Sequence, residues 1–162
     1  MRIDKIDSQE WISAGPITIG AVTTAPTKGT TRTYDNVRYR KINSTTYELE
    51  YKYAQVGITG AAAGDGSYLF SLPAGITWGS SVLLSPAADS LITSMNKSIP
   101  TAGQILNGSN QQRLLIVVPY NSTQFRMIGS NVGAEGSFVA NNYYGLTTTG
   151  VTYKVRFYVD TN

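Results

Sequence analysis

Carboxylates are the main side chains in this sequence that could do chemistry, because it contains no cysteine and no histidine. That absence excludes thiol nucleophiles, Ser-His-Asp triads, disulfides and metal sites made of His or Cys. A glycosidase, by contrast, needs two carboxyl groups that face each other across a cleft. Glu48 and Glu50 share one face of a predicted strand, but their basic neighbours indicate a solvated surface instead. Asp65 and Glu135 occur in glycine-containing loops, and no pattern in the sequence brings them together.

Metal binding has equally little support. Gly64-Asp65-Gly66 could supply part of a calcium loop, yet a cage of oxygen ligands needs several such groups. The flanking alanines, Ala61 to Ala63, offer only backbone carbonyls. We therefore predict no catalytic residue, no metal site and no cofactor, and we interpret the chain as a non-enzymatic protein that binds or assembles.

Sugar binding is a separate hypothesis, because sugars have apolar faces as well as hydroxyl groups. A site for them combines exposed aromatic rings with hydrogen-bonding side chains. One such cluster lies in a predicted loop near the C-terminal end, and a lone tryptophan lies between Thr77 and Gly79. The alternative is that these aromatic residues belong to the core or to a contact between subunits. The predicted glycan-binding residues are Trp78, Asn141, Asn142, Tyr143 and Tyr144.

β-strands are the elements expected to position these side chains. Charged residues make up only 14% of the chain, well below the usual level of about a quarter, which disfavours long helices with charged outer faces. The strongest periodic signal is Tyr47 to Tyr53, where tyrosine or leucine occupies every second position and Glu48, Glu50 and Lys52 lie between. A period of two with aromatic residues predicts a strand with one apolar face.

The preceding segment, Val37 to Ile42, alternates in the same way, and Asn43-Ser44 supplies a turn. We therefore predict an antiparallel hairpin in which Arg38 and Arg40 pair with the glutamates of the next strand. Exposed pairs of this kind contribute roughly 0.2–1 kcal/mol each, so they set register more than stability. The alternative for the two arginines is a phosphate or sulfate site.

The tyrosine stripe of the second strand has two interpretations. As core residues, Tyr47, Tyr51 and Tyr53 need hydrogen-bond partners for their hydroxyl groups. As an interface, the same three residues would form the apolar centre of a contact within a trimer.

The rest of the chain continues the β pattern. Val151 to Val159 alternates strictly and predicts a strand inside a sheet, while the apolar run Arg113 to Val118 predicts a central strand. Further short strands are predicted at 16–22, 68–72, 82–84, 104–106 and 124–128, with loops at 23–33 and 56–67 and one possible helical turn within 86–101. We expect an all-β chain: an antiparallel β-sandwich of about eight strands with jelly-roll (tumour-necrosis-factor-like) topology. Residues 1–14 are predicted to be an arm or a first edge strand, and residues 15–162 a single domain.

Charge and the chain ends limit the expected partners. The net charge is +3, and the basic residues are scattered, so the sequence does not predict nucleic-acid binding. Met1 to Asp7 carries mixed charge without an apolar stretch, so we predict no signal peptide. No apolar run is long enough to span a membrane.

Four segments follow one another along the chain: Val37-Arg38-Tyr39-Arg40, Tyr47-Glu48-Leu49-Glu50-Tyr51, Gly66-Ser67-Tyr68-Leu69-Phe70-Ser71-Leu72-Pro73-Ala74-Gly75-Ile76 and Val118-Pro119-Tyr120-Asn121-Ser122-Thr123-Gln124-Phe125-Arg126. In this order they resemble a recurrent domain of phage and large-DNA-virus (phycodnavirus-like) structural proteins. Where that group has a second arginine and a glycine, this chain has Lys41-Ile42-Asn43.

The resemblance implies a jelly-roll domain of a capsid, tail or fibre, commonly assembled as a trimer. The expected partners are copies of the same chain, other virion proteins and host glycans, and the expected location is the virion, after synthesis in the host cytoplasm. A stand-alone carbohydrate-binding module is the alternative. The resemblance supplies no catalytic residues.

Overall fold

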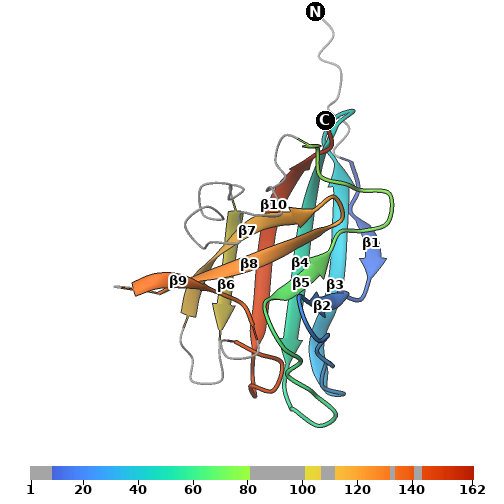
Figure 1. Ribbon diagram of the computed structural model, residues 1–162. Coiled ribbons are helices and arrows are strands. Elements are labelled where there is room, and N and C mark those ends of the chain that lie inside the picture. The colour runs from blue at the N-terminus through green and yellow to red at the C-terminus, as the bar shows by residue number, and fades with distance from the viewer. Residues whose placement is uncertain (1–8, 81–100, 107–111, 132–133, 141–143) are drawn as a thin grey trace, which may run out of the picture.

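The computed structural model describes residues 9–80, 101–106, 112–131, 134–140 and 144–162, and its regular elements are β-strands (Figure 1). The predicted strand at 82–84 and the possible helical turn within 86–101 lie outside the described residues. The strands are β1 (Ile12–Gly15), β2 (Ile19–Ala21), β3 (Arg32–Lys41), β4 (Thr46–Gln55), β5 (Tyr68–Ser71), β6 (Thr101–Leu106), β7 (Gln112–Asn121), β8 (Gln124–Asn131), β9 (Ala134–Phe138) and β10 (Thr152–Asp160).

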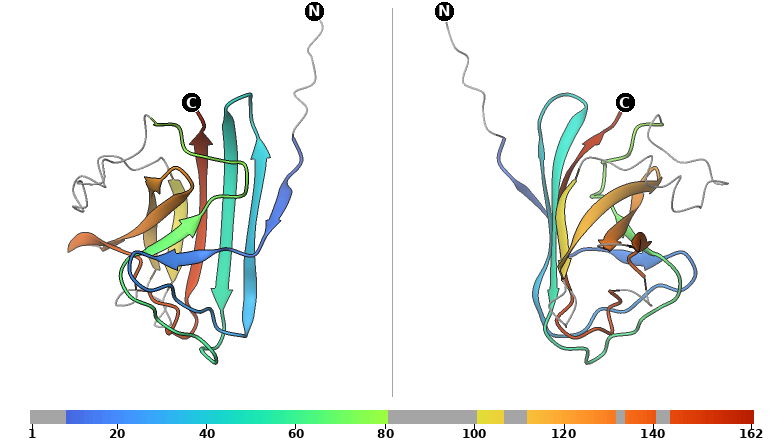
Figure 2. Two further views of the ribbon diagram at one scale, coloured as in Figure 1. Left: turned by 45° about the vertical axis from the view of Figure 1, so that its right-hand side comes forward. Right: turned by 90° about the vertical axis from the view of Figure 1, so that its left-hand side faces the viewer.

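All strand pairs are antiparallel and join into one curled sheet, in the order β1-β3-β4-β10-β6-β7-β8-β5-β2, with β9 paired to β8. β7 produces the curl, because its first residues pair with β6 and its later residues pair with β8. The two halves of the sheet thereby face each other across the core, like half of a barrel (Figure 2). The predicted all-β, antiparallel class is confirmed.

Aromatic side chains dominate the core between the two halves. The ring of Phe125 lies 5.0–5.1 Å from those of Phe157 and Tyr51 and 5.6 Å from that of Phe70. The Tyr51 hydroxyl donates to the backbone carbonyl of Ser71 at 2.7 Å, which satisfies its polar atom inside the core. The inward positions of β4 and β10 are therefore filled mainly by aromatic and aliphatic side chains.

Most of the predicted strands are present, with some shifts at their ends. The β3–β4 hairpin and the central placement of β10 are as expected, and residues 12–15 form an edge strand rather than a free arm. β3 begins at Arg32, inside the predicted loop. β9 was not predicted, because the segment 129–145 is polar and rich in glycine and asparagine.

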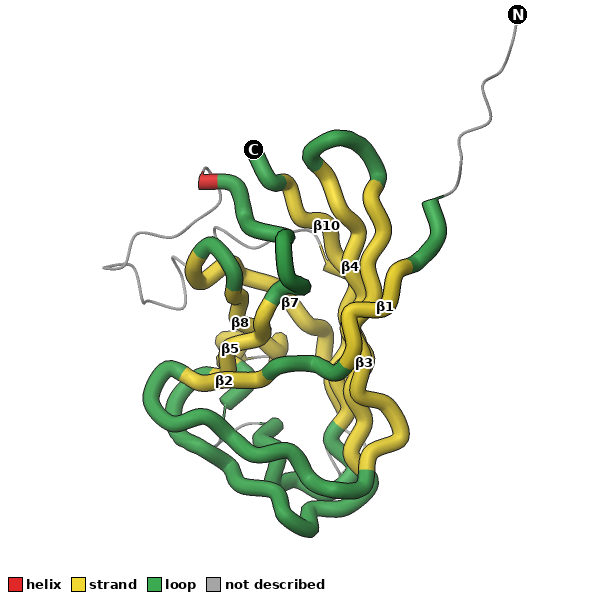
Figure 3. Tube along the Cα trace, turned by 90° about the vertical axis from the view of Figure 1, so that its right-hand side faces the viewer, coloured by secondary structure: helices red, strands yellow, loops and turns green. Residues whose placement is uncertain are grey.

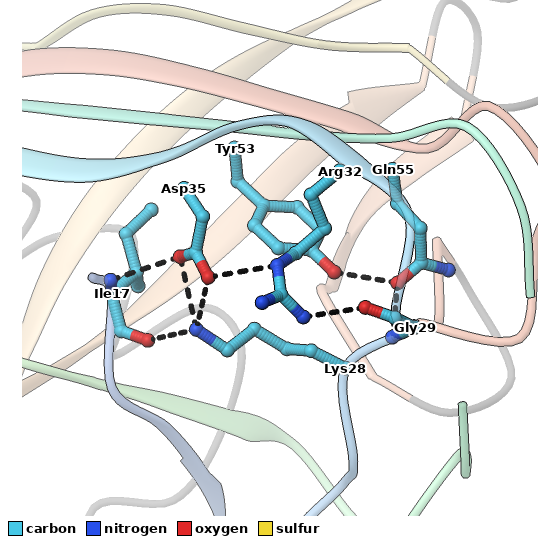
Figure 4. A network of polar contacts seen from close by, with 7 residues as sticks. All are labelled: Ile17, Lys28, Gly29, Arg32, Asp35, Tyr53 and Gln55. Carbon is cyan, nitrogen blue, oxygen red and sulfur yellow. Dashed lines mark hydrogen bonds and ion pairs between the residues drawn. The ribbon is translucent and has the colours of Figure 1, made fainter. Parts of the chain in front are cut away.

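A partly buried ionic network fixes the loop before β3 onto the sheet (Figure 4). The Asp35 carboxylate accepts hydrogen bonds from Lys28 Nζ at 2.7 and 2.9 Å and from the backbone N–H of Ile17 at 3.0 Å. Arg32 Nε lies 3.1 Å from the same carboxylate. Gln55 Oε1 accepts from the backbone N–H of Gly29 at 2.7 Å, on the same side of the loop. The Asp35 carboxylate therefore connects the segment before β2, the loop before β3 and the start of β3.

Replacing Asp35 by asparagine is expected to loosen this loop and to lower the free energy of unfolding by about 1–3 kcal/mol, because two partly buried cations lose their counter-charge. Lys28 and Arg32 are themselves trypsin sites, so limited trypsin digestion of the native protein should cut there faster in Asp35→Asn. Asp160→Asn, at an exposed carboxylate of β10, is the control. Equal cleavage rates for both variants would show that the network does not fix the loop.

Candidate functional site

The outward side of β3, β4 and β10 carries a band of charged side chains. Strand alternation sends the tyrosines of β4 into the core, so the residues between them point outward. The strand register places Glu50 between Arg38 and Arg156, and Glu48 between Arg40 and Tyr158. We call this band the outer face; it consists of Arg38, Arg40, Glu48, Glu50, Lys52, Lys154, Arg156 and Tyr158.

Glu50 is the centre of the outer face. Its Oε1 lies 2.6 Å from Arg38 Nε and 3.1 Å from Lys52 Nζ, and its Oε2 lies 2.7 Å from Arg156 Nη2. Burial by itself raises the pKa of this carboxyl group, but hydrogen bonds from Arg38, Arg156 and Lys52 outweigh it and lower the pKa to about 2. Glu50 is therefore ionised at neutral pH and fully engaged.

Glu48, two residues before Glu50 in β4, is also held by arginines. Its Oε2 lies 2.6 Å from Arg40 Nη2, and its Oε1 lies 3.8 Å from Arg156 Nε. The predicted hairpin ion pairs are therefore confirmed, and Arg38 and Arg40 are each bound by a glutamate. The interpretation of the two glutamates as solvated was wrong, because each side chain is only 3% exposed beneath its arginines. Neither carboxylate is free to act as a general acid or base.

Trp11, which directly precedes β1, covers the arginines of the outer face. Its ring centre lies 4.6 Å from Cζ of Arg38, 5.0 Å from Cζ of Arg40 and 5.4 Å from Cζ of Arg156. Such cation–π contacts contribute roughly 0.5–2 kcal/mol, more where water is excluded. The register of Trp11 opposite Arg40 follows from the β1–β3 pairing, in which Ile12 lies opposite Tyr39.

Lys52 and Lys154 lie directly opposite each other across the β4–β10 pair. Lys52 reaches Glu50, whereas Lys154 is exposed and forms no ion pair with any described residue. Two adjoining depressions share these lysines. One, of about 210 Å³, lies toward Tyr34 and Thr152, and the other, of about 400 Å³, lies toward Arg156. Sequence reasoning missed this pair, since the two residues are 102 positions apart and only the strand register brings them together.

Of the predicted glycan residues, the structure describes Trp78 and Tyr144, and both pack against the core rather than on the outer face. Trp78 is 4% exposed and packs against Phe125 and Phe157, so it belongs to the core, one of the two alternatives for it. Tyr144 is half-buried against the core, with its ring beside Gly129. The remaining predicted residues, Asn141, Asn142 and Tyr143, lie outside the described residues.

The three predicted interface tyrosines point into the fold. Tyr51 and Tyr53 have no exposed surface, and Tyr47 is half-buried in an edge-to-face contact with Tyr39 at 6.2 Å. The Tyr53 hydroxyl donates to Gln55 Oε1 at 2.6 Å. The tyrosine stripe therefore belongs to the core, the first of its two interpretations. A Tyr51→Glu substitution would place a charge in the core and would not test an interface.

No match to this chain is found among known protein families, curated proteins or solved structures. Within the described ranges, no cluster of three or more Asp or Glu side chains is arranged to hold a metal ion. No helix in the described part of the chain is long and apolar enough to cross a membrane. The outer face is therefore the surface on which a functional proposal rests.

Proposed function

We propose that this chain is a non-enzymatic structural domain of a virion, with jelly-roll topology, that assembles into homo-oligomers and presents its outer face for attachment. The observation that carries the proposal is the outer face itself. It is a polar surface organised by two buried carboxylates and a covering tryptophan, and its chemistry suits binding rather than catalysis. The proposed location is the virion, after synthesis in the host cytoplasm, with other virion proteins and host glycans as further partners.

The motif segments support the resemblance to virion domains, because they form adjacent parts of one core. β5 carries Tyr68-Leu69-Phe70-Ser71 and pairs with β8, which carries Gln124-Phe125-Arg126. Phe70 lies opposite Phe125, and their rings stack at 5.6 Å. The recurring aromatic positions of these segments therefore serve the fold, as expected for a shared domain architecture.

β1 is the element best suited to assembly. It lies at one end of the strand order, so one side of its backbone has no partner among the described strands. Figure 3 shows it at the margin of the sheet beside β3. An unpaired edge of this kind is a template for pairing with another chain. Ile12 of β1 is 50% exposed, which adds apolar area to the same edge.

Replacing Ile12 by lysine is expected to reduce the mass measured by light scattering from three chains to one, because a lysine on an exposed edge opposes strand pairing. Ile12 is half-exposed, so the substitution costs little folding stability. Val56→Lys, at a residue that is 57% exposed and outside β1, is the matched control and should keep the wild-type mass. An unchanged mass for Ile12→Lys would remove β1 as the contact.

A stand-alone carbohydrate-binding module is the second candidate. The observation that favours it is the depression between Tyr34 and Lys154, where an exposed aromatic ring adjoins polar side chains. Neighbouring genes separate the two candidates, because capsid or tail genes support the virion and a glycosidase gene supports the module. Glycan binding by a chain that stays monomeric at all concentrations would favour the module.

A further inference from the structure

We propose that Lys52 and Lys154 form a binding site for an acidic sugar, one whose ring carries a carboxylate or a sulfate. This inference rests on the proposed attachment role of the outer face and names the class of ligand. The two ammonium groups would bind the anionic group, and the exposed ring of Tyr34 would contact the apolar face of the sugar beside it.

The lysine pair is unfavourable for the fold itself. Like charges directly opposite each other on neighbouring strands destabilise a sheet. Lys52 is partly compensated by Glu50 at 3.1 Å, while Lys154 is exposed and unpaired among the described residues. The outer face holds five cations and two carboxylates, and Asp160 adds a third carboxylate farther along the same side of β10, opposite Thr46, so a local excess of positive charge remains. A bound anion would relieve the repulsion within the lysine pair.

The surface beside the lysines has a shape that suits a sugar ring. The next row of the sheet places Ala54 between Tyr34 and Thr152, so a small side chain lies between two larger ones. This row adjoins the depression of about 210 Å³, which Tyr34, Thr152 and the two lysines line. Tyr34 is 56% exposed, and its ring offers a flat apolar surface at the rim. Sites that bind sugars combine an aromatic ring with neighbouring hydrogen-bonding groups.

An extended acidic peptide fits the lysine pair less well than a sugar. β4 and β10 lie in the interior of the sheet, where each pairs on both sides. Their backbone N–H and C=O groups are therefore occupied, and strand addition is impossible at this place. The ligand must be recognised by side chains alone, which suits a compact molecule with its polar groups on the outside. Asn36, opposite Lys52, adds an amide to the same row.

Titration calorimetry with sialyllactose, sulfated lactose and unmodified lactose tests the proposal, since all three share one neutral core. We expect at least one acidic sugar to bind at least tenfold more tightly than lactose, with an affinity that falls at high salt. Lys154→Gln should weaken acidic-sugar binding about tenfold or more, and Tyr34→Ala about fivefold. The two acidic sugars show whether the carboxylate or the sulfate is preferred.

Lys41→Gln is the matched control, because Lys41 lies over the Tyr47 ring and away from the lysine pair. It should bind as the wild type does. Lys154→Gln should unfold at a temperature no lower than the wild type, because it removes a repulsion rather than a contact. Loss of binding in that variant therefore cannot be attributed to unfolding.

Three outcomes would overturn the site: equal binding of lactose and both acidic sugars, unaltered binding by Lys154→Gln, or tighter binding of a glutamate hexapeptide than of either acidic sugar. The light-scattering mass of the same samples separates this inference from the proposed function. A stable oligomer that binds no acidic sugar would refute the site and leave assembly in place. Sugar binding by a chain that is always monomeric would keep the site and refute assembly.

Discussion

Replacing Phe125 by alanine is expected to lower the free energy of unfolding by about 3–5 kcal/mol, because it opens a cavity where both halves of the sheet meet. The Phe125 side chain has no exposed surface. Its ring contacts four other aromatic rings, those of Tyr51, Phe70, Trp78 and Phe157, at centre distances of 5.0–6.4 Å. Those neighbours come from β4, β5, β10 and the segment after β5, so the lost contacts weaken the whole core at once.

Urea unfolding followed by tryptophan fluorescence measures this effect, since Trp78 lies in the same core. Tyr158→Ala is the control, because Tyr158 is an aromatic residue of β10 that is 50% exposed. Its substitution should change stability by about 0.5 kcal/mol or less. Similar losses for the two variants would mean that Phe125 is not at the centre of the core.

Replacing Glu50 by glutamine is expected to lower the free energy of unfolding at pH 7 by about 3 kcal/mol. Glutamine keeps the shape of the side chain but removes the charge that Arg38, Lys52 and Arg156 share. Three cations would then remain close together over the outer face without this counter-charge. Glu10→Gln, at an exposed carboxylate before β1, is the control and should leave stability unchanged.

The same substitution should change how stability depends on pH. The pKa of Glu50 is about 2 in the folded protein and 4.5 in its reference state, so its contribution is complete above pH 4.5 and is lost as the pH falls toward 2. Wild-type stability should therefore fall across that window, and Glu50→Gln should fall less steeply. Parallel pH profiles for the two proteins would contradict the ion network as described.

The sequence predicted the hairpin and the last strand well, because their information is local. Alternation over Val37–Ile42, Tyr47–Tyr53 and Val151–Val159 records which side of each strand is buried. The hairpin also fixed the pairing of Arg38 with Glu50, since a short turn determines the register of the two strands.

The outer face could not be predicted as a site, because it depends on pairings between distant segments. Arg156 reaches Glu50 across 106 positions, and Trp11 reaches the arginines through the edge pairing of β1 with β3. No periodic pattern in the sequence indicates which strand pairs with the edge of β4 that faces away from β3. Both glutamates are buried because those neighbours cover them. The sequence contains no sign of this cover, so the position of the glutamates between tyrosines indicated a solvated surface.

Trp78 shows why residue type alone does not locate a binding site. Between Thr77 and Gly79 it has the surroundings of an exposed aromatic, yet it stacks on Phe157 at 5.8 Å inside the core. The segment that carries it has no strand alternation, so the sequence offered no signal for its direction. Tyr34, which the sequence placed next to a loop, is instead an exposed ring on the outer side of the sheet.

Assembly is the central claim, and the mass of the wild-type chain in solution tests it most directly. Light scattering over a wide range of protein concentrations measures that mass without a label or a partner. We predict three times the chain mass of 17.5 kDa. A mass of one chain at every concentration would contradict the claim that this domain works by assembling.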